Sequence, residues 1–139
     1  MMVSTKGRYA LRVMIDLAQH QTDGYLPLKE IAARQDISEK YLESILKTLV
    51  QNDILVGMRG KGGGYRLTRP AAEYTVGNIL QLTEENLAPV ACLGKNANPC
   101  PRTEHCPTLD MWKELYTLTT DYLNNITIAD LAKQPNQLP

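Results

Sequence analysis

Several features are missing from this sequence of 139 residues, and each absence removes a class of protein. It has no phenylalanine, one tryptophan and two histidines. Because no serine or cysteine nucleophile stands beside a positioned base, and no paired carboxylates stand in a recognisable frame, an enzyme is the least expected class. The sequence also lacks an apolar run of about eighteen residues and a secretion signal, so we expect a cytoplasmic protein without a membrane span.

Cysteine is scarce and unevenly placed. Cys92, Cys100 and Cys106 all lie in one segment, CLGKNANPCPRTEHC. An odd number of cysteines cannot close as disulfides within one molecule, and a chain of this length can bury a core without a disulfide or metal. In a reducing compartment, clustered cysteines more often bind a metal or sense redox state.

Net charge is absent overall, but the zero hides an asymmetry between the two halves. Residues 1–70 contain eleven Lys and Arg against seven Asp and Glu, whereas residues 71–139 contain four against eight. The segment 54–69, ILVGMRGKGGGYRLTR, carries four basic residues and no acid: Arg59, Lys61, Arg66 and Arg69. This asymmetry favours a polyanionic partner for the first half. A solvated basic hairpin is the alternative.

Hydrophobic spacing predicts helices at 5–20, 28–34 and 38–53, the last with Ser38 as its N-cap. Two short alternating runs joined by GKGGG then predict a β-hairpin with a glycine tip. This order of elements is that of a winged helix-turn-helix domain, in which the third helix enters the DNA major groove. We therefore predict a mainly α fold with a small β-wing, and a DNA-binding domain at 1–74.

The second half, 75–139, is expected to hold a linker helix at 75–86, a cysteine loop at 88–106 and a long dimerisation helix at 107–125. A short final helix follows, capped by Thr127 to Asp130, and the end beyond Pro135 is expected to fray. The long helix carries an apolar or semi-apolar seam that predicts pairing with a second copy; the alternative is packing on its own domain. The seam consists of Leu109, Trp112, Tyr116, Thr119, Leu123 and Ile126.

Four segments in order, STKGRYALRVMIDLA, ISEKYLESILKTL, VGMRGKGGGYRL and LNNITIADLA, resemble the IscR/NsrR/CymR family of bacterial winged-helix repressors. The three clustered cysteines resemble the iron–sulfur-binding branch of that family. The resemblance implies a transcriptional repressor. It also implies a homodimer crossed through the long helices and a roughly palindromic operator in double-stranded DNA.

The resemblance also implies which residues contact DNA. Ser38, at a helix N-terminus, can bind phosphate, and Glu43 can accept a hydrogen bond from the amino group of cytosine. Arg59 can enter a groove, and Tyr41 has a half-buried core position as its alternative role. A nucleotide is not expected, because GKGGG lacks the phosphate-loop spacings. The expected DNA-binding residues are Ser38, Glu39, Tyr41, Glu43, Arg59, Gly60 and Lys61.

Three thiolates on a proline-stiffened loop suit an iron–sulfur cluster or zinc. Cys106 precedes Pro107, the predicted first residue of the long helix, and is therefore expected to cap that helix. There the helix dipole would favour its thiolate form. The resemblance implies an iron–sulfur cluster held by Cys92, Cys100 and Cys106, and leaves [2Fe–2S] and [4Fe–4S] both open.

At the positions where the family supplies a fourth ligand to the cluster, this sequence departs from both known patterns. The iron–sulfur biogenesis regulator uses a histidine at the position that Leu109 occupies here. The nitric-oxide-sensing branch uses an acid from the partner's first helix, where this chain has Arg8 and Arg12. We expect Asp110 or His105 as the fourth ligand, with Glu104 or a small molecule as the alternatives.

Two other interpretations stay open. The cysteines could serve as a thiol redox switch or a zinc site, or the protein could act by binding an enzyme or cluster-assembly factor.

Overall fold

A computed structural model describes residues 2–133 of the chain. Its elements are α1 (Thr5–Gln19), α2 (Leu28–Gln35), α3 (Glu39–Gln51), β1 (Leu55–Met58), β2 (Gly64–Leu67), α4 (Val76–Thr83), α5 (Leu109–Asn124) and α6 (Ile128–Ala132), with short 3-10 turns at 71–73, 91–93 and 103–105. The predicted mainly α fold with a small β-wing is confirmed. The expected fraying beyond Pro135 lies outside the described residues.

Helices α1 and α3 each begin at a serine whose side chain caps the helix. The hydroxyl of Ser4 accepts a hydrogen bond from the Gly7 amide, and that of Ser38 accepts one from the Tyr41 amide at 3.2 Å. Between α2 and α3, Asp36 adopts a left-handed conformation with φ 52°, which produces the turn of the helix-turn-helix. The buried faces of α1, α2 and α3 then pack on one another around a common core. Its fully buried members include Ala10, Val13, Met14, Ile31, Leu42, Ile45, Leu46 and Leu49.

The wing is an antiparallel hairpin with the register Leu55↔Leu67 to Met58↔Gly64. A third segment completes it, because Leu26 and Tyr65 exchange two backbone hydrogen bonds of 2.9 Å. Gly64 lies directly against the Leu26 carbonyl at φ 147°, so no larger residue fits at this crossing. The wing is thereby fixed to the segment that leads into α2.

Two predicted boundaries in the second half are wrong. The linker helix ends at Thr83 and not at 86, because the Glu84 carboxylate turns back to the start of α1. There it accepts hydrogen bonds from the Ser4 amide at 3.0 Å and the Ser4 hydroxyl at 2.7 Å. The long helix begins at Leu109 with Thr108 as its N-cap, so Pro107 is not its first residue.

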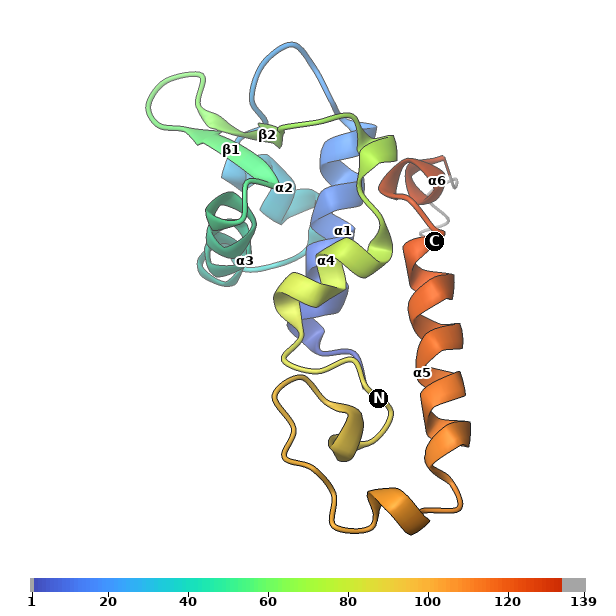
Figure 1. Ribbon diagram of the computed structural model, residues 1–139. Coiled ribbons are helices and arrows are strands. Elements are labelled where there is room, and N and C mark those ends of the chain that lie inside the picture. Colours follow the sequence, from blue (N-terminus) through green and yellow to red (C-terminus); the bar gives the residue numbers. More distant parts are fainter. Residues whose placement is uncertain (1, 134–139) are drawn as a thin grey trace.

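Helix α1 runs between the wing and the cysteine loop (Figure 1). The wing lies near its C-terminal end, and the cysteine loop lies beyond its N-terminal end. Helix α5 rises alongside from the cysteine loop. The chain then returns to the first half, where Val76 N donates to Ile126 O at 2.8 Å and Ile128 N donates to Tyr74 O at 2.9 Å. The predicted capping box between Thr127 and Asp130 is confirmed.

Helix α5 differs from the other long helices because it contains no buried residue among those described. Within residues 2–133, no helix is long and apolar enough to cross a bilayer.

Candidate nucleic-acid interface and cysteine loop

A hollow lies between α3, the predicted recognition helix, and the wing. From α3 it is lined by Lys40, Glu43, Ser44, Lys47, Val50 and Gln51, and from the hairpin by Gly57, Met58, Arg59, Gly64 and Tyr65. Two residues predicted to bind DNA, Glu43 and Arg59, are therefore brought to one surface. They come from segments that only the folding of the hairpin onto α3 joins.

The charge of this hollow is dominated by cations. Glu43 is its one acid among the described lining residues, whereas Lys40, Lys47 and Arg59 are basic and exposed. Lys40 and Lys47 lie one helical turn before and after Glu43, so all three share one face of α3. Sequence analysis did not assign the two lysines, although their spacing from Glu43 was a signal that could have found them.

The other predicted DNA-binding residues surround this hollow without lining it. Ser38 and Glu39 are exposed at the start of α3. Gly60 and Lys61 are exposed at the wing tip, where Gly60 has φ +90°, a conformation that a residue with a side chain rarely adopts. Tyr41 is half-buried, in keeping with the alternative of a partly structural role.

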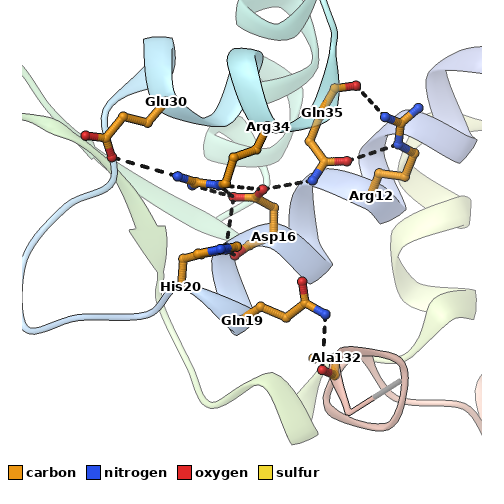
Figure 2. A network of polar contacts seen from close by, with 8 residues as sticks. All are labelled: Arg12, Asp16, Gln19, His20, Glu30, Arg34, Gln35 and Ala132. Carbon is orange, nitrogen blue, oxygen red and sulfur yellow. Dashed lines mark hydrogen bonds and ion pairs between the residues drawn. The ribbon is translucent and has the colours of Figure 1, made fainter. Parts of the chain in front are cut away.

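A polar network under the helix-turn-helix holds α1 against α2 (Figure 2). The carboxylate of Asp16 is fully buried, and it accepts hydrogen bonds from Arg34 Nη2 at 2.7 Å, Arg34 Nε at 3.0 Å and Gln35 Nε2 at 2.8 Å. The hydrogen bonds between Arg34 and Asp16 are the largest cause that raises the pKa of Arg34 above its ordinary value. The buried charge is thus satisfied on several sides. Sequence analysis did not assign Asp16, because an acidic residue in an amphipathic helix is typical of the exposed face.

The cysteine loop is open in this structure. All three cysteines are free; Cys92 is exposed, and Cys100 and Cys106 are half-exposed. Among the described residues, no three side chains of His, Cys, Asp and Glu are grouped closely enough to hold a metal ion. The loop carries the donors that a cluster would need, but it does not bring them together here.

Cys106 differs chemically from an ordinary thiol. Its sulfur lies 3.5 Å from the Thr108 hydroxyl. Hydrogen bonding from that hydroxyl is the first cause that lowers the pKa of Cys106, followed by the backbone of Thr108, while burial opposes the shift. The predicted thiolate preference agrees in direction. Its physical cause is this turn, because Cys106 precedes the N-cap and does not itself cap α5.

The candidates for a fourth ligand all lie near Cys106. Glu104 and His105 are exposed in the 3-10 turn at 103–105, and Asp110 is exposed in the first turn of α5. No candidate is singled out by its position.

Helix α5 carries two apolar faces. The predicted seam is half-buried within the chain, where Tyr116, Thr119 and Leu123 line a hollow against α4 and the cysteine loop. An adjacent face, rotated by roughly 100°, presents large apolar side chains to solvent. They are Met111, 52% exposed, Leu115, 41%, Leu118, 61%, and Tyr122, 67%. Sequence analysis missed this second stripe.

Comparison with known proteins agrees with this architecture. The family model described as "Rrf2: Iron-dependent Transcriptional regulator" matches residues 3–134. The HTH-type transcriptional regulators IscR of Serratia proteamaculans and of Pectobacterium carotovorum are each 37% identical over 138 residues, which is 99% of this chain and 83% of each relative.

Solved structures give the same result. CymR (YrzC), the global cysteine regulator of B. subtilis, superposes with a TM-score of 0.76 at 32% identity, covering 95% of this chain and 96% of CymR. T. potens IscR superposes with a TM-score of 0.74 at 33% identity, covering 100% of this chain and 93% of that chain. The chain therefore belongs to the Rrf2 family and is an IscR-like transcriptional regulator.

Proposed function

We propose that this Rrf2-family regulator binds operator DNA through α3 and the wing, in the bacterial cytoplasm, and acts as a repressor controlled by an iron–sulfur cluster. The observation that carries the proposal is the hollow that places Glu43 and Arg59 together among exposed lysines. Such a surface combines a group that distinguishes bases with cations that bind phosphate. A regulatory rather than an enzymatic role also agrees with the relatives, which are transcriptional regulators.

Each group on this surface has a role that its chemistry permits. Glu43 accepts a hydrogen bond from the amino group of cytosine, and the basic wing residue Arg59 enters a groove. Ser38 and the exposed lysines bind phosphate oxygens. Replacing Glu43 with alanine should therefore change which sequences are preferred. Replacing Lys61 should weaken binding to all sequences and reduce its dependence on salt concentration.

We propose that the protein acts as a homodimer on a palindromic site. The stripe Met111, Leu115, Leu118 and Tyr122 supports this proposal, because four large apolar side chains on one helix face are costly to leave in water. A second copy offers the same stripe, so a two-fold axis would bury both. Two winged domains related by that axis would then meet two half-sites.

The chemistry of the cysteine loop fits an iron–sulfur cluster. Cys92, Cys100 and Cys106 supply three soft thiol ligands, and the lowered pKa of Cys106 favours the thiolate that binds iron. A bound cluster would supply a redox-sensitive crosslink between these residues. Because the loop joins α4 to α5, gathering the cysteines would constrain the angle between the dimerisation helix and the winged domain.

The test begins with protein purified without oxygen. Its absorbance spectrum is recorded, and its iron and acid-labile sulfide are counted per chain. Visible sulfur-to-iron bands with matching iron and sulfide are expected, and Cys92→Ala should abolish them. Operator duplexes are then selected from a random-sequence pool, and their affinity is measured with and without the cluster. Equal affinities for both forms would reject cluster control while leaving DNA binding intact.

The free, half-exposed Cys106 with its lowered pKa also supports a second candidate, a thiol redox switch on the same DNA-binding scaffold. Mass spectrometry after mild peroxide treatment distinguishes the two candidates. Reversible sulfenate or disulfide at these cysteines, in a protein that stays iron-free after reconstitution, would favour the switch. Stoichiometric zinc in place of iron would instead identify a zinc site.

A further inference from the structure

Arg12, on the exposed side of α1, is bonded to the end of α2. Its Nε donates to Gln35 Oε1 at 3.1 Å, and its Nη2 donates to the Gln35 backbone carbonyl (Figure 2). Gln35 is the last residue of α2, immediately before the left-handed Asp36 of the turn. The Arg12 guanidinium therefore hydrogen-bonds both the side chain and the main chain of Gln35, at the turn of the helix-turn-helix.

The same guanidinium also reaches toward the recognition helix. The carbon at its centre lies 4.7 Å from the centroid of the Tyr9 ring, the geometry of a cation–π contact. Tyr9 in turn meets the Tyr41 ring edge to face, with centroids 5.9 Å apart and an interplanar angle of 83°. Tyr41 lies in the first turn of α3, where it packs partly buried against the core, on a different side of the helix from Glu43. A continuous chain of contacts thus runs from the turn to α3.

These contacts are directional, unlike the core beneath them. The apolar side chains that seat α3, such as Leu42 and Ile45, resist removal from the core but tolerate small rotations of the helix. A guanidinium fork bonds only along fixed directions and stacks only with its plane over a ring. Gln35 is itself held from its other side, because its Nε2 donates to the buried Asp16.

We infer that Arg12 is a positioning residue for DNA recognition. Through Gln35 it fixes the turn, and through Tyr9 it fixes Tyr41, so that α3 presents its base-contacting face at one angle. This inference rests on the proposed DNA binding and adds a residue outside the hollow to it. Arg12 does not line that hollow, so its effect on sequence preference would be transmitted through its neighbours.

Arg12→Lys tests the inference, because lysine keeps the positive charge and loses the fork and the planar stack. The matched control is Arg8→Lys, one turn earlier on α1, where the arginine bonds to Thr5 of its own helix. Affinities are measured by fluorescence anisotropy on a duplex that the wild-type protein selects from a random-sequence pool, and on a scrambled duplex. Both are titrated over a range of salt concentrations.

We expect Arg12→Lys to lower affinity for the selected duplex about tenfold, with less than about twofold change on the scrambled duplex and an unchanged salt slope. Arg8→Lys should match the wild type. Tyr9→Leu should resemble Arg12→Lys, whereas Tyr9→Phe, which keeps the ring, should not. Because the two residues act in one chain of contacts, the double variant Arg12→Lys with Tyr9→Leu should lose little more than either single variant.

Three outcomes would overturn the inference. Wild-type affinity of Arg12→Lys on the selected duplex would show that the fork positions nothing. Equal losses on both duplexes, with a salt slope lower by about one in Arg12→Ala, would make Arg12 a phosphate contact. Full additivity in the double variant would break the chain between Arg12 and Tyr9. Failure of the wild-type protein to select any duplex would instead overturn the proposed function, and the inference with it.

Discussion

The two halves of this chain are built differently. In residues 1–74, the half proposed to bind DNA, α1, α2 and α3 bury their apolar faces against one another. Among the described residues, the second half contributes two buried members to that core, Ile79 and Ile128, and the partly buried Leu82 packs against it. Helix α5 is as long as α1 but buries none of its described residues and exposes four large apolar ones. The first half thus buries its apolar faces within one chain, whereas the second leaves an apolar face exposed, which the proposed dimer would cover.

The largest expected effect comes from the exposed stripe of α5. Leu118→Lys places a charge in the proposed dimer contact and should produce a monomer. A loss of about 2 kcal/mol from each of two copies would weaken association roughly a thousandfold. Sedimentation velocity measures it, and Thr117→Lys, on the far side of the helix, is the control. A stable dimer in the Leu118→Lys variant would place the interface on another face.

A core substitution should behave in the opposite way. Leu46→Ala removes a fully buried side chain of α3 and should lower the free energy of unfolding by about 2–5 kcal/mol at every protein concentration. Leu115→Ala, on the exposed stripe, should cost less, and its cost should depend on protein concentration, because it acts through association. Urea unfolding at several concentrations separates them. Equal, concentration-independent losses would remove the distinction between the halves.

The junction between the halves is sensitive to a single methyl group. A Cβ on Gly7 of α1 would overlap the Glu84 carboxylate that ends α4, with Leu80 Cδ2 and Thr83 Oγ1 both 3.1 Å away. Gly7→Ala should therefore destabilise the protein by about 1–3 kcal/mol, despite the better helix propensity of alanine. Chemical denaturation measures it.

The control for this junction is Gly24→Ala, whose nearest neighbour is Thr22 Oγ1 at 4.0 Å. Adding Glu84→Ala to Gly7→Ala should restore part of the stability, because it removes the overlapping carboxylate. A Gly7→Ala protein as stable as the wild type would mean that the side chains around Gly7 can move aside without cost.

The same contrast explains what could be predicted from sequence. The caps at Ser38 and Thr127 and the glycine-tipped hairpin depend on neighbours close in the chain, and all are confirmed. The end of α4 depends on Ser4, 80 residues away, and was predicted too late. The spacing of apolar residues within one segment cannot predict a contact between residues so far apart in the chain.

The candidate sites also contain some features that could be predicted from the sequence and others that could not. The resemblance predicts that Glu43 and Arg59 bind DNA; the structure brings them to one hollow, and their role stays a proposal. The link from Arg12 to Gln35 and Tyr9 could not, because an exposed arginine on a helix has many partners available. The second stripe of α5 was not predicted, because it lies next to a heptad seam of apolar residues on the same helix. The structure leaves the cysteines apart, so their role stays a proposal.

The smallest expected effect is local to the cysteine loop and needs no partner chain. Because the pKa of Cys106 is lowered, its thiolate should persist to lower pH than that of an ordinary cysteine. In reduced, iron-free protein, the rate of Cys106 alkylation by iodoacetamide should reach half its maximum at a lower pH than in urea. Thr108→Val removes the first cause of the shift and should move that midpoint upward. The backbone hydrogen bond from Leu109 and the positive charge of Arg102 should still keep the pKa of Cys106 partly lowered.

The matched control for this last experiment is Thr103→Val, which removes a hydroxyl that donates to the Cys100 carbonyl in the same loop. It should leave the Cys106 midpoint unchanged. Peptide mass spectrometry assigns the alkylated residue. If Thr108→Val and the wild type share one midpoint, the turn does not tune the thiol. Cys106 would then resemble the rest of the second half, whose chemistry would depend on a ligand or partner that draws the loop together.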